Sequence, residues 1–132
     1  MILLDSSAVL AMLQGEPGAD RVVSALASDA AAISAANLAE VLSILAVRGG
    51  VALDEARMLI GELDIQVIPV TDEIATSSAE IAMRHPRSGL SLGDRLCIAT
   101  GIVHRCAVLM ADQAWLGLEL DAEIESIRSG AK

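Results

Sequence analysis

Short apolar runs alternate with longer stretches of helical periodicity along the chain, beginning with Ile2-Leu3-Leu4. Three aliphatic residues are too few for a helix and suit a strand that is buried on both faces, as in a parallel sheet. Similar runs recur downstream, and Pro69, which lacks a backbone N–H, places its own strand at a sheet edge. We predict strands at 2–4, 31–33, 65–70, 107–110 and 123–127.

The stretches between these strands carry apolar residues at helical spacing and begin with residues that commonly cap helices. Ser91 and Asp94 match a capping box. We predict caps at Ser6 or Ser7, Ser34, Asp54, Thr71 or Asp72, Ser91 and Asp112, and helices that end near residues 14, 28, 48, 63, 85 and 104. Strands that alternate with helices predict a three-layer α/β fold, with a parallel sheet of four to five strands and helices on both faces.

The length of 132 residues suits one domain, residues 1–132, with its own core and a frayed tail at 128–132. No apolar stretch reaches the roughly 18 uncharged residues of a transmembrane helix. No basic segment precedes the first apolar run, as it would in a signal peptide. We therefore expect a cytoplasmic protein.

The balance of charge narrows the possible partners. The formal charge is −9, which argues against a protein that binds nucleic acid duplexes through a broad basic face. Such a charge fits a protein that concentrates carboxylates or has a basic partner. The only lysine is Lys132, the last residue, so we do not expect a mechanism that needs a buried catalytic lysine.

Glu40 is the least ordinary residue of the sequence, because its predicted helix is otherwise nearly all apolar. Such a helix should be buried on most of its surface. A carboxylate there is costly unless it is paired, protonated or bound to a cation. Asn37 and Ser43 lie three residues to either side, on the same helical face. Glu40 could instead lie at a solvent gap or in a buried ion pair.

Three further acids stand at the ends of strands or the starts of helices. Asp5 and Asp112 each follow an apolar run and precede a helix, which places both at the carboxyl edge of the sheet, where ligands bind in open α/β folds. Asp94 lies in the first turn of its helix. Each of these acids could simply cap a helix. Together with Glu40, however, they could converge on one pocket.

Several carboxylates in one pocket raise each other's pKa and cannot all remain ionised without compensation. Hard divalent cations supply that compensation, and Mg²⁺ or Mn²⁺ prefers oxygen ligands. The two histidines and two cysteines lack the spacing of a zinc site. The pattern therefore points to a Mg²⁺ site and to phosphoryl chemistry with a metal-activated water.

Four motifs carry a family resemblance that spans nearly the whole chain. They are Leu4-Asp5-Ser6-Ser7-Ala8, Ala39-Glu40-Val41, Leu90-Ser91-Leu92-Gly93-Asp94-Arg95-Leu96-Cys97 and Leu109-Met110-Ala111-Asp112-Gln113-Ala114-Trp115. In their order and spacing they resemble the PIN-domain ribonucleases, and more narrowly the VapC toxins of bacterial toxin–antitoxin pairs.

The resemblance implies a PIN-like fold in which Asp5, Glu40, Asp94 and Asp112 bind Mg²⁺, with support from the hydroxyl of Ser6 or Ser7. It also implies metal-dependent hydrolysis of an RNA phosphodiester, homodimers, and inhibition by a VapB-like antitoxin with a basic or aromatic segment. The family usually has Thr or Ser two residues before the last aspartate. This chain has Met110 there, which leaves the orientation of Asp112 in question.

The densest basic group, Arg84, His85, Arg87 and Arg95, flanks Asp94 and could steer an RNA backbone, or could be ordinary solvated charge. Met58 and Ile81 are candidates for an exposed apolar dimer surface. Two alternatives to the ribonuclease remain. Receiver domains and haloacid-dehalogenase-type phosphatases also begin with an aspartate after a strand, but they need a late lysine. A non-catalytic PIN-like module that binds RNA or a partner is the other.

Overall fold

The computed structural model describes residues 1–128, which form a five-stranded sheet in the order β3-β2-β1-β4-β5 with every neighbouring pair parallel. The strands are β1 (Ile2–Leu4), β2 (Ala31–Ser34), β3 (Ile65–Ile68), β4 (Ala107–Met110) and β5 (Ile124–Ser126). This confirms the predicted α/β fold. It also confirms the edge position of β3, which ends just before Pro69.

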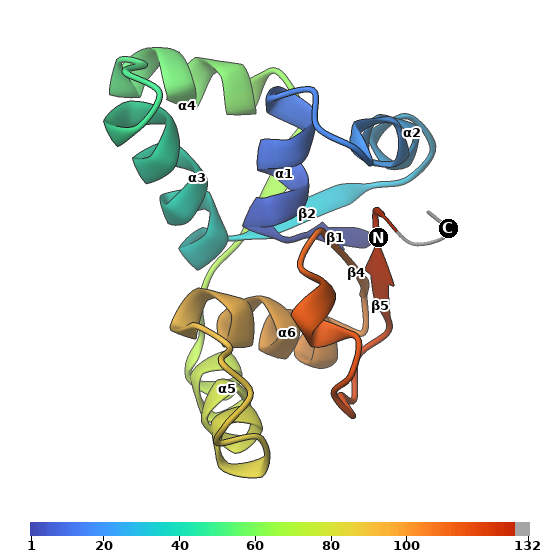
Figure 1. Cartoon of the computed structure of the whole chain (residues 1–132). Coiled ribbons are helices and arrows are strands. Elements are labelled where there is room, and N and C mark those ends of the chain that lie inside the picture. Colours follow the sequence, from blue (N-terminus) through green and yellow to red (C-terminus); the bar gives the residue numbers. More distant parts are fainter. Residues whose placement is uncertain (129–132) are drawn as a thin grey trace.

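Helices cover both faces of the sheet, as Figure 1 shows. They are α1 (Ser6–Leu13), α2 (Ala19–Ser28), α3 (Ala35–Val47), α4 (Leu53–Gly61), α5 (Asp72–Arg84) and α6 (Leu92–His104), with a 3₁₀ turn, η1, at Gln113–Trp115. Residues of β1 alternate between the two layers. Ile2 and Leu4 join a core with α1 and α2, whereas Leu3 joins a second core with α5 and α6.

The order of the strands reverses at β1. The chain first moves outward from β1 to β2 and β3, and it then returns to the opposite side of β1 as β4 and β5. In open parallel sheets, the carboxyl ends of the two strands at such a reversal border a crevice where ligands bind. Asp5 and Asp112 follow β1 and β4, so the topology brings both to this crevice.

The predicted caps are confirmed at Ser34, Thr71, Ser91 and Asp112, whose side chains accept hydrogen bonds from the helices that they precede. Two cap predictions were wrong. Asp5, rather than Ser6 or Ser7, caps α1, because its carboxylate accepts the amide hydrogen of Ser7. The helix α4 begins one residue before Asp54, which instead lies in the first turn.

The expectation that the apolar helix α3 would be mostly buried was also wrong. Only Asn37, Leu38 and Val41 are buried, and Val47 is 83% exposed. Figure 1 shows the physical reason, because α3 runs away from the sheet toward α4. Its later residues Leu42 and Leu45 still pack against the core but are only partly buried. Of the two candidates for an exposed apolar surface, Met58 is exposed, but Ile81 is buried against α6.

Arg128, the last described residue, contacts the loop between α1 and α2. Arg128, which we expected in a frayed tail, donates from Nε to the carbonyl of Pro17 (3.1 Å) and lies 3.6 Å from the Glu16 carboxylate. The rest of that predicted tail, residues 129–132, lies outside the described residues. Within residues 1–128, no helix is long and apolar enough to cross a membrane.

Candidate acidic site at the carboxyl edge of the sheet

Asp5 is held at the end of β1 by hydrogen bonds of its backbone and of its side chain. Its backbone N–H donates to the carbonyl of Leu109 in β4 (2.9 Å). Its Oδ2 accepts hydrogen bonds from the amide and the hydroxyl of Ser7. The same hydroxyl oxygen accepts from the amide of Ala111 (2.9 Å), so Ser7 joins Asp5 to the segment that leads to Asp112. Ser7 therefore fixes one carboxylate oxygen and leaves the other free.

The other oxygen of Asp5, Oδ1, is buried and has no hydrogen-bond partner among residues 1–128. Burial raises the pKa of Asp5 from 3.8 to about 6, against the lowering effect of the two Ser7 hydrogen bonds, and the charges of Asp94 and Glu40 add to the rise. Buried polar atoms are rarely left without a partner. A cation is one partner that would both accept this oxygen as a ligand and favour the ionised form.

Glu40 faces the same region from α3. Its Oε1 accepts hydrogen bonds from the hydroxyl of Ser6 (2.9 Å) and from Nδ2 of Asn37 (2.9 Å). Asn37 is fully buried, and its Nδ2 also donates to the carbonyl of Gly93 in α6 (3.2 Å). The two adjacent serines thus donate hydrogen bonds to different acids, Ser6 to Glu40 and Ser7 to Asp5. Ser43 takes no part in this network, because its hydroxyl donates to the carbonyl of Ala39.

Gly93 belongs to the site, although our sequence analysis named it only as part of a motif. A Cβ built on Gly93 would lie 2.5 Å from Oε2 of Glu40 and 2.7 Å from Oε1. Any side chain at residue 93 would therefore occupy the space of the Glu40 carboxylate. A glycine in the first turn of a helix, where it is intrinsically unfavourable, was the only sequence signal of this close approach.

Asp94 forms the predicted capping box and also joins the acidic region. Its Oδ2 accepts from the amide of Ser91 (3.0 Å), and its own amide donates to the Ser91 hydroxyl (3.1 Å). Burial raises the pKa of Asp94; the Ser91 hydrogen bonds oppose this rise, and the charges of Asp112 and Glu40 reinforce it. Asp94 can therefore both cap α6 and take part in the acidic site, because the cap uses only its Oδ2.

Asp112 is exposed and is oriented by the turn that it caps, since its Oδ1 accepts from the amide of Ala114 (3.0 Å). The preceding Met110 is fully buried in the core beneath α6 and does not form part of the site surface. The residue that replaces the family's usual Thr or Ser therefore serves packing. The orientation of Asp112 comes from η1, which is anchored by the buried Trp115.

The four acids share one electrostatic region. Asp5 senses the charges of Glu40 and Asp94, and Asp94 senses those of Glu40 and Asp112. All-oxygen donors of this kind suit Mg²⁺ or Mn²⁺, and the partnerless Oδ1 of Asp5 is a suitable ligand atom. With the side chains as they stand, residues 1–128 contain no group of three acids, histidines or cysteines already spaced to hold one ion.

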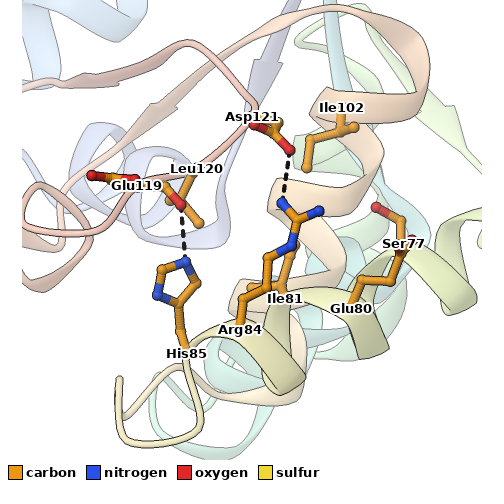
Figure 2. Close-up of a pocket in the computed structure, with 9 residues that line it drawn as sticks. All are labelled: Ser77, Glu80, Ile81, Arg84, His85, Ile102, Glu119, Leu120 and Asp121. Carbon is orange, nitrogen blue, oxygen red and sulfur yellow. Dashed lines mark hydrogen bonds and ion pairs between the residues drawn. The ribbon is translucent and has the colours of Figure 1, made fainter.

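The basic residues near Asp94 in the sequence are partly engaged elsewhere. Arg84 forms an ion pair with Asp121 (3.0 Å), and Nε2 of His85 lies 2.9 Å from the carbonyl oxygen of Glu119, as Figure 2 shows. Arg87 lines a shallow hollow with His85 and Leu118. Arg95 is half-buried and directly follows Asp94 in α6.

The fold is that of a parallel α/β domain with an acidic region at the carboxyl edge of its sheet, where the strand order reverses. Within that class, the model of the PIN domain family matches residues 2–118. The chain belongs to the PIN domain family. No curated protein sequence matches it significantly.

Several solved structures share this fold at low sequence identity. A toxin–antitoxin complex from Klebsiella pneumoniae superposes with a TM-score of 0.72 at 20% identity, over 94% of this chain and 100% of that one. FitAcB from Neisseria gonorrhoeae gives 0.71 at 22% identity, over 98% and 99%. VapC20 from Mycobacterium tuberculosis, described as a toxin that cleaves the sarcin–ricin loop, gives 0.71 at 20% identity, over 93% and 99%.

Proposed function

We propose that this protein is a Mg²⁺-dependent endoribonuclease that acts as the toxin of a VapBC-type toxin–antitoxin pair. The observation that carries the proposal is the buried Asp5, whose free Oδ1 lies in the field of Glu40 and Asp94. Membership of the PIN domain family supports it. Further support comes from the similar folds of a toxin–antitoxin complex and of a toxin described as cleaving the sarcin–ricin loop.

In this proposal, Asp5, Glu40, Asp94 and Asp112 hold Mg²⁺, for which Mn²⁺ can substitute. When bound, the metal would supply an activated water for attack on phosphorus and would offset negative charge on the leaving oxygen. The rest of the network keeps the ligands in place. Ser7 orients Asp5, whereas Ser6 and Asn37 orient Glu40. Arg87 and Arg95 would contact the RNA backbone, and Arg84 would do so only after leaving Asp121.

We also propose an antitoxin whose basic or aromatic segment covers the acidic region, together with a homodimer of the toxin. The formal charge of −9 supports a basic inhibitory segment. Exposed apolar residues support a protein partner on α3 and α4, because Val47, Leu53 and Met58 are each more than half exposed.

The direct test is cleavage of structured RNA by the purified protein with Mg²⁺ or Mn²⁺. Asp5→Asn should abolish cleavage, and EDTA should do the same. Asp20→Asn is the matched control, because Asp20 is an exposed acid in the first turn of α2, away from the site, and this variant should cleave normally. Cleavage that persists in Asp5→Asn or in EDTA would contradict the metal site. Metal-dependent binding of RNA without cleavage would favour the non-catalytic module.

The toxin assignment has a separate test in cells. Expression of the chain alone should arrest growth, and co-expression of a small gene encoded beside it should restore growth. Asp5→Asn should be harmless at the same protein level. Unimpaired growth with a demonstrably folded wild-type protein would contradict the assignment, even if cleavage is observed in the purified system.

A further inference from the structure

Two segments that adjoin Asp94 and Asp112 in the chain also meet each other at the end of α5. Residues 85–91 lead into α6 and Asp94, and residues 116–123 follow Asp112 and η1. Figure 2 shows their meeting point, where Arg84 and His85 at the end of α5 face Glu119 and Asp121. His85 and Leu118 also line the neighbouring hollow together with Arg87 and Ser88.

His85 is the centre of this meeting point. Its Nε2 lies 2.9 Å from the carbonyl oxygen of Glu119. Since a carbonyl can only accept a hydrogen bond, Nε2 must carry the hydrogen. The backbone of His85 is also engaged on both sides, because its amide donates to the carbonyl of Ile81 (2.9 Å) and its own carbonyl accepts from the amide of Ser88 (3.1 Å). His85 thus joins α5 to both segments.

Short hydrogen-bonded steps connect His85 to Asp94. The amide of Ser88 donates to His85, and the Ser88 hydroxyl accepts from the amide of Leu90 (3.2 Å). Ser91 comes next and forms the capping box with Asp94. Residues 86–91, which lead into α6, are therefore tied to His85 at one end and to Asp94 at the other.

A similarly short series of contacts connects Glu119 to Asp112. The amide of Leu118 donates to the carbonyl of Trp115 (3.2 Å), the buried residue of η1, and Asp112 caps that turn. Asp94 and Asp112 lie close enough for the charge of Asp112 to raise the pKa of Asp94. No hydrogen bond joins the side chains of these two acids among residues 1–128, so their separation depends on the segments that carry them.

We infer that His85 is a positioning residue, which through Glu119 sets the distance between Asp94 and Asp112. This inference rests on the proposed function, because it assigns His85 a role in a metal site that those acids form. The ion pair of Arg84 with Asp121 runs parallel to the His85 contact. Its side chains are 59% and 72% exposed, so solvent screens it and it adds little.

The test compares His85→Ala with His85→Gln in the full chain, because the glutamine amide can still donate toward Glu119. His104→Ala is the matched control, since His104 is the exposed histidine at the end of α6. Titration with Mn²⁺ should show that His85→Ala raises the Kd about three- to tenfold, as expected for a lost supporting hydrogen bond. The other two variants should stay within about twofold of the wild type.

Hydrogen exchange of the metal-free proteins gives a second readout that requires no activity. Peptides that cover 86–94 and 112–120 should both exchange faster in His85→Ala than in the wild type, and neither should change in His104→Ala. If His85→Ala does not fold, His85→Met preserves the bulk of the ring without its donor and should behave as predicted for alanine.

Wild-type Mn²⁺ affinity in a folded His85→Ala, or faster exchange confined to 86–94, would overturn the inference. Failure of the wild-type protein to bind Mn²⁺ would instead overturn the proposed function. In that event the exchange experiment still decides whether His85 couples the two segments. Equal losses in His85→Gln and His85→Ala would also count against it, because they would show that the Nε2 hydrogen bond is not the cause.

Discussion

Gly93 offers the sharpest test of how the site is built, because α6 and Glu40 approach each other there without room for a side chain. In Gly93→Ala, the new Cβ would lie 2.5 Å from Oε2 of Glu40. The backbone of Gly93 does not have a positive φ angle, so alanine is compatible with the helix. Alanine should even stabilise α6 by about 0.5–1 kcal/mol relative to glycine.

The clash should be relieved by movement of the Glu40 carboxylate, which is the end of a flexible side chain. Such a movement breaks the hydrogen bonds from Ser6 and Asn37, and hydrogen bonds to charged groups contribute about 1.5–3 kcal/mol each. Loss of even one of them would weaken a ligand by at least roughly tenfold, since about 1.4 kcal/mol corresponds to a factor of ten. We expect the Mn²⁺ affinity to fall by about tenfold to a hundredfold, the loss that is typical when a residue supporting a metal ligand is changed.

Two measurements on the same protein separate the effects. Isothermal titration calorimetry measures the affinity for Mn²⁺, and urea unfolding in EDTA measures the stability of the metal-free fold. Gly61→Ala is the matched control, because Gly61 is also a helical glycine and a Cβ there meets nothing within 4 Å. That variant should be slightly more stable and bind Mn²⁺ normally. Unchanged Mn²⁺ affinity in Gly93→Ala would refute the reasoning, as would a large loss of stability without any loss of affinity.

Three further predictions concern the acids and their supports. Asp5→Asn should stabilise the metal-free protein at pH 7.5, because a folded pKa of about 6 against 3.8 represents a penalty of roughly 3 kcal/mol. The penalty is present in full well above pH 6 and disappears as the pH falls from about 6 toward 3.8. In urea unfolding, the free energies of unfolding of the two proteins should therefore converge over that pH range. A difference that stays constant with pH would contradict this explanation. Asn37→Ala should cost about 1–3 kcal/mol in urea unfolding, since it removes the amide donor to the Gly93 carbonyl and one of the two hydrogen bonds to Oε1 of Glu40; an unchanged midpoint would argue that water replaces the amide. Met110→Thr should lower stability by about 2–4 kcal/mol without accelerating RNA cleavage, because residue 110 is buried in the core; faster cleavage at unchanged stability would show that the side chain reaches the site.

The sequence was most informative where local signals agree with the tertiary structure. Three aliphatic residues predicted a strand buried on both faces, and all three residues of β1 are indeed buried. The capping box of Ser91 and Asp94 was predicted from spacing alone and is confirmed. Local signals were ambiguous at the start of α1, where Asp5, Ser6 and Ser7 can all act as caps. Only the geometry shows that Asp5 caps the helix while Ser6 turns toward Glu40.

In α3, by contrast, the local signal in the sequence did not agree with the tertiary structure. Hydrophobicity predicts burial, but it does not distinguish the core of one chain from a surface that a partner covers. The helix leaves the sheet after its first turns, and Val47 is therefore exposed. The same helix carries Glu40, which meets Asn37 of its own helix but also Ser6 of α1 and Gly93 of α6, two residues far from it in the sequence.

Periodicity, capping and charge are local properties, and they were enough to predict the strands and helices, the parallel sheet and the set of four acids. The contacts that each acid makes with distant segments became known only from the fold. The free oxygen of Asp5, the space that Gly93 leaves for Glu40 and the contact of His85 with Glu119 each depend on segments brought together by the fold. Such distances follow from the packing of whole helices against the sheet, and no window of the sequence contains them.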